Sequence, residues 1–482
     1  MKKSLIHSKE SGVVLFYMAA LLFVLLAFAG LAVDLGRAYV VKAHLSKAVD
    51  GAALAAARMI GNGQTAAQTE ANKIFNANFP NGYLGVSSVQ NPPATSFQVA
   101  ADGSNQITVS STAVMPTTFM KVIGQPQVNV FSSGQAIRRL VDISFVIDKS
   151  GSLSAVWGQV QSAAQQFVGY FDQNVDRMAI VGFSGNTIVT DTIRTVSRGF
   201  DKATVLSHIA GLANGGNTCS AEGMYQGWDQ LRSVTSGNQS SLRIIVFFTD
   251  GSPNSFPGTF NVQSSPGVFV SRTGVLFTGD YPNLGSSSTN TPTVTGLYQT
   301  YGTYAAQSQQ FVAPTDNTYT SGNSSSPYTS PLDSKIPWIP LMSTHSNHVS
   351  SGIPTSFVLY DPTLAGQRQL IGQTVNGYPD HVRNANNAAR NLLETVANAA
   401  KADTTGDFKI RIYALGLGGL LPQSMGSVPE TGTSLLKRVA NDKTSPDFNS
   451  SQLEGKYYYA ADPAQLRAAF EAVRNQILRL SM

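Results

Sequence analysis

An uninterrupted apolar run near the N-terminus constrains this chain more than any other feature. It extends from Val13 to Val33, reads VVLFYMAALLFVLLAFAGLAV, and contains no charged residue. As an α-helix rising about 1.5 Å per residue, it matches the roughly 30 Å hydrocarbon core of a bilayer. It also lacks the polar stripe of a helix that packs on a globular core. The run predicts a transmembrane helix over residues 13–33, preceded by a cytoplasmic stub, residues 1–12.

The charges around this run predict its orientation. Lys2, Lys3 and Lys9 precede it, and short basic segments stay on the cytoplasmic side of a membrane. The bulk of the chain would then lie on the opposite side. A cleaved signal peptide is the alternative, because Ala27-Phe28-Ala29 fits a cleavage site. The anchor is favoured because the residues beyond that site stay apolar.

Residues 34–79 are rich in Ala and Leu and predict a helical extension of the membrane helix. From Gly12 to about Arg58 the sequence resembles the N-terminal region of TadG-like proteins of the Tad (Flp) pilus assembly machinery. The shared pattern is a Gly before an apolar span, then AVDLGR, then the Ala-rich core AVDGAALAAA. Related TadE-like and pilin-like proteins carry Glu where this chain has Tyr17. The resemblance implies a single-pass protein of the bacterial inner membrane with its bulk in the periplasm.

Residues 80–138 alternate as short strands do and predict a small β-rich module. FQVAAD and QITVSSTAV have apolar residues at every second position, and Asp102-Gly103 between them is a hairpin signal. VNVFSSGQAI reads as a third strand. No function is readable in this module.

Residues 139–482 change to alternating strand and helix patterns. VDISFVID, RMAIVGFSG, RIIVFFTDG and KIRIYALGLGG read as buried strands. Helical spacing of apolar residues follows the first strand, recurs from Asn384 to Ala402, and returns in a last helix that begins at Asp462-Pro463. This alternation predicts an α/β fold, a Rossmann-like, parallel-rich sheet between helices.

Three separated loops of this domain carry hydroxyl and carboxylate side chains. They are DKSGS after the first strand, GGNT before a helix, and TDG at the end of RIIVFF. Loops at the carboxyl ends of strands meet over one crevice in an open α/β sheet. The side chains that would face one point are Asp148, Ser150, Ser152, Thr218 and Asp250. Such oxygen donors suit a divalent cation, with Mg²⁺ favoured and Mn²⁺ or Ca²⁺ as alternatives.

The order of these loops resembles the metal-ion-dependent adhesion site (MIDAS) of von Willebrand factor A (vWA) domains, over about 141–252 and again over 381–480. By that resemblance Ser150, Ser152 and Thr218 are direct metal ligands. Asp148 and Asp250 would bind directly or through water. The resemblance also implies a protein partner whose acidic side chain completes the coordination shell, and no catalysis. Lys149 occupies a position that varies in the family and receives no role.

Residues of about 253–380 interrupt the domain with a Ser-, Thr-, Gly- and Tyr-rich insertion far longer than an ordinary βα connection. Recurring Tyr, Phe and Val favour an irregular or β-rich lobe over a disordered linker. The insertion starts beside Asp250, so it either shapes the binding surface or acts as a spacer. His345 and His348 in it are interpreted as part of a solvated loop, not as a zinc site.

Several other functions are disfavoured. The net charge of +5, from 33 Lys and Arg against 28 Asp and Glu, is too small to indicate nucleic-acid binding. Cys219 is the single cysteine, so it forms no internal disulfide and is predicted to be a small buried residue. The sequence contains no P-loop, HExxH or G-x-S-x-G motif, so no enzymatic activity is predicted.

Two non-enzymatic functions fit these observations. In the first, the protein is a membrane-anchored component of Tad pilus assembly whose vWA domain binds pilin or another component of the machinery. In the second, it is a secreted or surface-exposed vWA adhesin that binds host or matrix ligands. The N-terminal resemblance favours the first function, and the composition of the insertion keeps the second open.

Overall fold

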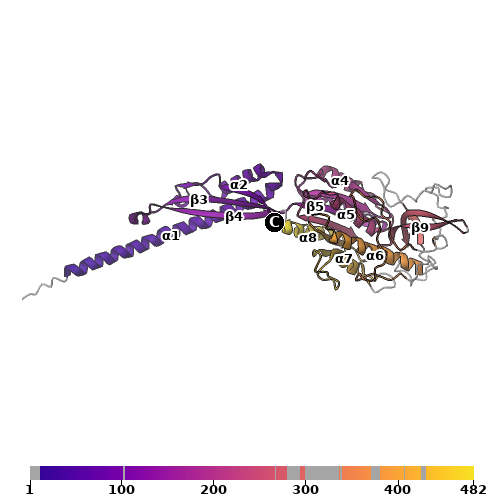
Figure 1. The fold of residues 1–482 in the computed structure, drawn as a ribbon. Helices are drawn as coiled ribbons and strands as arrows, with labels where there is room; N and C mark the ends of the chain where they lie inside the picture. The colour runs from indigo at the N-terminus through magenta and orange to yellow at the C-terminus, as the bar shows by residue number, and fades with distance from the viewer. Residues whose placement is uncertain are drawn as a thin grey trace, which may run out of the picture. The chain divides into compact units, whose positions relative to one another are not determined.

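The computed structural model describes residues 11–100, 104–265, 267–278, 294–298, 336, 339–370, 380–406, 408–424 and 430–481. Its internal contacts divide the chain into two compact units, with the boundary between Arg138 and Arg139. Figure 1 draws both units.

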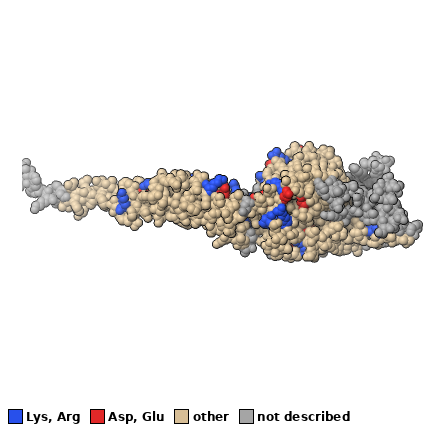
Figure 2. Space-filling model, turned by 90° about the horizontal axis from the view of Figure 1, so that it is seen from above, with Lys and Arg blue, Asp and Glu red and all other residues tan. Residues whose placement is uncertain are grey.

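The first unit begins with one long helix, α1 (Ser11–Met59). The part of α1 that starts at Val13 is long and apolar enough to cross a membrane, with a mean hydropathy of 2.6. Its side chains as far as Phe28 are exposed in the structure, and Figure 2 shows the described start of the helix as an uncharged surface on the face in view. The predicted extension over 34–79 is interrupted: a 3₁₀ turn (Ile60–Asn62) separates α1 from α2 (Gln64–Asn78).

An antiparallel sheet completes this unit. Its strands are β1 (Ser88–Val89), β2 (Ala94–Val99), β3 (Asn105–Pro116) and β4 (Gln127–Arg138). β2 and β4 flank β3 on opposite sides, and the burial of β3 alternates as its sequence predicts. The Asp102-Gly103 turn lies outside the described residues.

The helices and the sheet of the first unit share one hydrophobic core. Ala52 and Ala56 of α1 and Phe75 of α2 lie in the same buried cluster as Ile107 and Val109 of β3. The two segments that the sequence separates, 34–79 and 80–138, therefore pack as one body. Small Ala side chains allow the close approach of helix and sheet that this packing requires.

The second unit is built around a sheet in the order β13-β12-β8-β5-β6-β7. Its strands are β5 (Val141–Asp148), β6 (Arg177–Phe183), β7 (Thr187–Asp191), β8 (Leu242–Thr249), β12 (Ile410–Leu417) and β13 (Lys456–Ala460). Neighbouring strands pair in parallel, except that β7 returns antiparallel along β6. Both β5 and β8 are buried at every position, as strands covered on both faces are.

Helices cover both faces of this sheet. One face carries α3 (Trp157–Gly169), α4 (Lys202–Gly211) and α8 (Pro463–Ser481). The other carries α5 (Ser220–Ser233), α6 (Asp380–Ala402) and α7 (Gly432–Ala440). The predicted α/β fold with a parallel-rich sheet between helices is confirmed.

The last helix starts as its sequence predicts. The Asp462 carboxylate accepts the backbone N–H of Gln465 at 3.0 Å, which is the contact of an N-cap residue. Leu466 and Phe470 of this helix are buried.

The described part of the insertion combines three β strands with an irregular segment, residues 339–370, and packs on the helices of the second unit. β9 (Ser255–Ser265) and β10 (Val268–Thr278) form a long antiparallel hairpin, and β11 (Val294–Tyr298) pairs with β10. Phe256 and Phe260 of β9 and Phe357 belong to the same hydrophobic cluster as α5 and α6. These residues agree with the irregular or β-rich lobe that the sequence favours.

The interpretation of His345 as part of a solvated loop is wrong. Its Nδ1 lies 2.6 Å from Glu222 Oε2 on α5, and neither side chain is exposed. His345 also stacks on Tyr225, with ring centroids 4.3 Å apart, and its Nε2 lies 3.1 Å from Ser343 Oγ. His348 is exposed. A buried imidazole and a carboxylate that hold each other require a tertiary contact that local sequence does not reveal.

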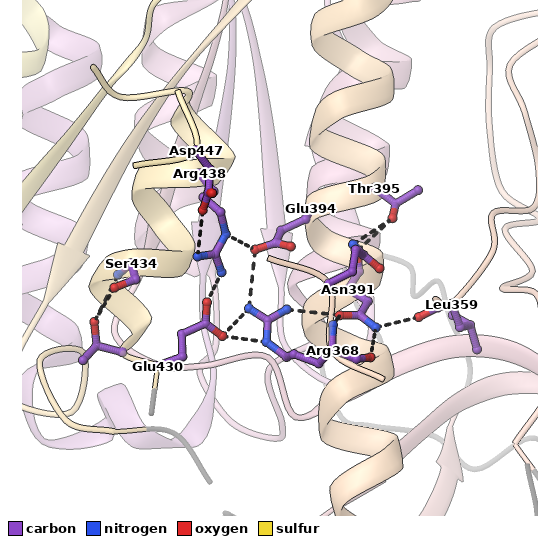
Figure 3. A network of polar contacts seen from close by, with 11 residues as sticks. Leu359, Arg368, Asn391, Glu394, Thr395, Glu430, Ser434, Arg438 and Asp447 are labelled. Carbon is purple, nitrogen blue, oxygen red and sulfur yellow. Dashed lines mark hydrogen bonds and ion pairs between the residues drawn. The ribbon is translucent and has the colours of Figure 1, made fainter. Parts of the chain in front are cut away.

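A polar network joins the end of the insertion to α6 and α7 (Figure 3). Arg368 forms ion pairs with Glu394 of α6 and with Glu430, and Arg438 of α7 forms ion pairs with the same two carboxylates. Asn391 of α6 accepts the backbone N–H of Arg368 at 2.8 Å. Burial raises the pKa of Glu394, which the two guanidinium groups oppose. The network fixes the described end of the insertion to the main fold.

Candidate metal-binding site

The first candidate loop leaves the end of β5 in the middle of the sheet. Asp148 is fully buried, and its Oδ1 accepts the backbone N–H of Ser150 at 2.8 Å. Its Oδ2 accepts the hydroxyl of Thr249 at 2.5 Å. Because β5 and β8 are parallel neighbours, their carboxyl ends meet at one edge, and the Asp148 carboxylate bridges them.

Three of the predicted ligands form a continuous row of oxygen atoms at this edge. Ser150 Oγ lies 3.1 Å from Ser152 Oγ. The Ser152 hydroxyl in turn donates to Asp250 Oδ1 at 2.9 Å. Asp250 follows the end of β8, so the row connects two loops that lie far apart in sequence. Asp250 is 8% exposed, which leaves this part of the row close to the surface.

The loop that carries Thr218 is bound against the first loop through its backbone. Gly215 N donates to the carbonyl of Lys149 at 2.7 Å, and Gly151 N donates to the carbonyl of Gly216 at 2.9 Å. Gly215 and Gly216 have φ values of 147° and 87°, which favour glycine strongly. The two glycines of GGNT are therefore required by the turn that brings the two loops together.

Thr218 itself is held by the beginning of the insertion. Its backbone N–H donates to Asn254 Oδ1 at 2.8 Å, and its carbonyl accepts the N–H of Asn254 at 3.2 Å. Asn254 was not identified from the sequence. An Asn in a Pro- and Ser-rich loop has no local feature that indicates this contact.

Burial governs the electrostatics of the site. It raises the pKa of Asp148 to about 6, against the opposing hydrogen bonds from Thr249 and Ser150 and the charge of Lys149. Because burial makes the ionised form of Asp148 costly, a bound cation would stabilise that form.

Lys149, to which the sequence assigned no role, is buried between the loop and the end of β6. Its Nζ donates to Ser184 Oγ at 2.8 Å. Burial lowers its pKa to about 8, while the neighbouring Asp148 opposes that shift. The side chain therefore supports the loop from beneath and contributes positive charge close to Asp148.

The donor set fits a hard cation better than a soft one. Within the described ranges, no group of three or more His, Cys, Asp or Glu side chains could hold a metal ion. A site here would depend on the hydroxyls of the Ser and Thr residues together with the two carboxylates, which are oxygen donors that Mg²⁺ accepts. Cys219 is buried, as predicted, and burial raises the pKa of its thiol. It is therefore a poor metal ligand.

Comparisons with protein families agree with both resemblances. Residues 142–280 match the von Willebrand factor type A domain. Residues 12–59 match the putative Flp pilus-assembly TadE/G-like family. No curated protein matches the chain significantly.

Solved structures similar to this chain include pilus proteins. The pilus adhesin SpaC from Lactobacillus rhamnosus GG, in its open conformation, aligns with a TM-score of 0.34 and 12% identity, over 81% of this chain and 34% of SpaC. The vWF domain of the type V pili tip protein Mfa5 from Porphyromonas gingivalis aligns with a TM-score of 0.34 and 16% identity, over 72% of this chain and 98% of that domain. This chain thus spans about a third of the length of SpaC.

A further similar structure is proximal thread matrix protein 1 from the mussel byssus, described with a zinc-occupied MIDAS motif. It aligns with a TM-score of 0.20 and 19% identity, over 24% of this chain and 30% of that one. These scores are low, so the assignment depends on the family matches and on the observed topology. The chain therefore contains a von Willebrand factor type A domain, preceded by a TadE/G-like pilus-assembly region.

Proposed function

We propose that this protein is a membrane-anchored component of Tad/Flp pilus assembly that binds a protein partner through a divalent cation. The combination of a TadE/G-like region with a vWA domain supports a role in the pilus machinery. The apolar first part of α1 supports a single-pass anchor. In this proposal residues 1–12 lie in the cytoplasm and the bulk of the chain lies in the periplasm, attached to the inner membrane.

The cation would be held by Asp148, Ser150, Ser152, Thr218 and Asp250. The observation that carries this proposal is the row of oxygen atoms from Ser150 through Ser152 to Asp250, beside the buried Asp148 carboxylate. Mg²⁺ is the preferred ion, and Mn²⁺ and Ca²⁺ are the alternatives to compare. A bound cation would supply an electrophilic centre for an acidic side chain of the partner. The role is binding, without a catalytic step.

Thermal unfolding with and without metal tests the site. A ligand at a hundredfold excess over its Kd stabilises the folded state by about 2.7 kcal/mol. For a domain of this size, this raises the melting temperature by about 5–10 °C. We expect that rise with Mg²⁺, its reversal by EDTA, and its loss in Ser152→Ala and Asp250→Asn.

Ser154→Ala is a matched control for the Ser152 variant. Ser154 lies in the same 3₁₀ turn, but its hydroxyl is not one of the proposed ligands. It donates to the carbonyl of Gly151 at 2.7 Å and accepts the side-chain amide of Asn214 at 2.7 Å. Ser154→Ala should keep the full response to Mg²⁺. If all three variants respond like the original protein, the proposed ligand set is wrong.

Partner binding and location need separate measurements. The full chain in detergent should retain pilin or another Tad component on a column in Mg²⁺ and release it in EDTA. After cell fractionation and alkaline wash, the protein should remain with the inner membrane. Recovery from the medium or the cell surface would instead support the alternative, a vWA adhesin that binds host or matrix ligands.

A further inference from the structure

The AVDLGR sequence that follows the apolar run has a structural role that the proposed function leaves unused. Asp34 is its acidic residue and is fully buried. Its carboxylate accepts the backbone N–H groups of Thr118 at 3.0 Å, Phe119 at 2.8 Å and Met120 at 2.8 Å. Arg37, one helical turn further on, donates to Thr118 Oγ1 at 3.1 Å. These contacts attach the loop between β3 and β4 to α1 at the first charged residue after the apolar run.

From this attachment the loop extends back along the apolar part of α1. The tip of the β3–β4 hairpin, residues 117–126, contains a 3₁₀ turn (Met120–Ile123). Phe119 packs on Gly30 so closely that a Cβ on Gly30 would lie 2.5 Å from Phe119 Cβ. The absence of a side chain at Gly30 is therefore what lets the tip lie against the helix.

The hairpin tip presents apolar side chains that no other described part of the protein covers. Val122 is 71% exposed and Ile123 is 64% exposed. Together with Met120 they face Phe23 and Ala27 of α1 across a crevice of about 510 Å³. One wall of this crevice is thus the same helical segment that the proposed function places in the bilayer.

The backbone of the tip is suited to apolar surroundings. Three backbone N–H groups of the tip donate to backbone carbonyls, each at 3.1 Å: Thr117 to Pro126, Val122 to Phe119, and Gln125 to Met120. Asp34 accepts the N–H groups at the start of the turn. A non-helical segment within a bilayer needs such internal partners, because lipid offers none. The exposed Lys121 has a long stem that can carry its charge towards the headgroups.

We propose that the hairpin tip inserts into the periplasmic leaflet beside α1 and that a lipid acyl chain occupies the crevice between them. The inference rests on the proposed membrane anchoring of α1. Phe23 lies about 15 Å along the helix from the end of the apolar run, which is about half of the hydrocarbon thickness. The apolar side chains of the tip lie beside this same segment, so the acyl chains of that leaflet are the surrounding material.

Fluorescence quenching by lipids tests this inference with the full chain in proteoliposomes of phosphatidylethanolamine and phosphatidylglycerol. The buried Cys219 is replaced by Ala, and single cysteines at Val122, Val99 or Leu22 carry an environment-sensitive dye. Val99 is a matched control, because it is 73% exposed and pairs with Asn105 at the opposite end of β3. That end lies roughly 35 Å from the tip.

Lipids brominated on their acyl chains should quench the dyes at Val122 and Leu22 to within twofold of each other and leave the dye at Val99 unquenched. Ile123→Cys, at a second exposed site of the tip, should behave like Val122→Cys. If Leu22 is quenched while Val122 and Ile123 behave like Val99, the insertion of the tip is refuted and the anchor stands. If Leu22 is not quenched, the anchoring of α1 fails, and the inserted tip fails with it.

A lipid with a photoreactive acyl chain tests the occupant of the crevice. It should crosslink to Met120 in the original protein. Ala27→Trp, which fills the crevice from the α1 side, should reduce this crosslink at least fivefold. Equal crosslinking in both proteins would show that no acyl chain lies between the tip and the helix.

Discussion

Removing the buried partner of Glu222 is expected to destabilise the vWA domain strongly. Glu222 and His345 have no exposed side-chain surface, and Glu222 Oε2 lies 2.6 Å from His345 Nδ1. In His345→Leu the Glu222 carboxylate keeps the amide of Gln226 at 2.9 Å but loses the imidazole. A buried charge left without its partner costs about 3–5 kcal/mol. At about 2–4 °C per kcal/mol for a large domain, the melting temperature should fall by about 6–20 °C.

A double variant separates the interaction energy of Glu222 with His345 from the contribution of each side chain to packing. Replacing a buried ion pair by apolar side chains of similar volume is often neutral, and we expect the same of this carboxylate–imidazole pair. Glu222→Leu with His345→Leu should therefore be far more stable than the sum of the single variants predicts. Urea unfolding of the full chain in detergent gives the four free energies of this cycle. We expect a coupling energy of about 2–4 kcal/mol. The exposed His348 provides a control, and His348→Leu should change stability by less than about 0.5 kcal/mol.

Hydrogen exchange adds a local measurement to the same variants. Because His345 lies in the insertion and Glu222 lies on α5, the single substitutions should accelerate exchange in β9, β10 and residues 339–359 more than in β5. The reasoning is refuted if each single variant loses less than about 1 kcal/mol, or if the two losses add without coupling. Either result would mean that the packing of Phe256, Phe260 and Phe357 holds the insertion without this pair.

Three further outcomes are expected. Without metal, the raised pKa of Asp148, about 6 against an ordinary 3.8, means that the folded state binds more protons than the unfolded state between these values. The free energy of unfolding should therefore fall by up to about 3 kcal/mol as pH rises from 4 to 6, a trend that urea titration in EDTA measures and that Asp148→Asn abolishes. For Asp34, burial alone would raise the carboxyl pKa, but the backbone N–H groups of Met120, Thr118 and Phe119 outweigh it and lower the pKa. The ionised Asp34 carboxylate thus stabilises the folded state above pH 3.8, and this stabilisation is lost as the pH falls through the lower pKa of the folded state. Asp34→Asn should therefore lower the melting temperature at pH 7 and change it little at pH 2. Finally, Gly134→Val on β4 would place a Cβ 2.4 Å from Asp50 Oδ1 and 2.8 Å from the backbone N of Asp50. Such overpacking costs about 1–3 kcal/mol, and thermal unfolding should show this loss. Gly124→Val at the hairpin tip is the comparison, because a Cβ there meets no atom within 4 Å and the φ of 85° leaves backbone strain as the only cost.

The sequence predicted those elements whose signals are local. Apolar periodicity and an N-cap located α8, and unbroken apolar runs located β5 and β8. The sequence also placed DKSGS and TDG at strand ends, and the structure joins Ser150, Ser152 and Asp250 there by hydrogen bonds. The short edge strand β7 was not predicted, because five residues after a Ser-Gly turn give too little periodicity to recognise.

The contacts that sequence reasoning missed join residues far apart in the chain. His345 and Glu222 are 123 positions apart, and Asp34 and Thr118 are 84 positions apart. The local sequence around each of these residues is typical of an ordinary surface loop or helix. Only the fold shows that their polar atoms are buried and therefore need partners.

The unbroken course of α1 determines how the first unit would carry mechanical load. The helix passes from its apolar stretch into the Ala-lined core without a hinge, and the long strands β3 and β4 run beside it (Figure 1). A pull along this common direction would load the helix–sheet interface in shear, so that many contacts must yield at once. A pull across it would peel the same contacts apart one after another. The first unit would therefore resist tension along α1 better than tension across it.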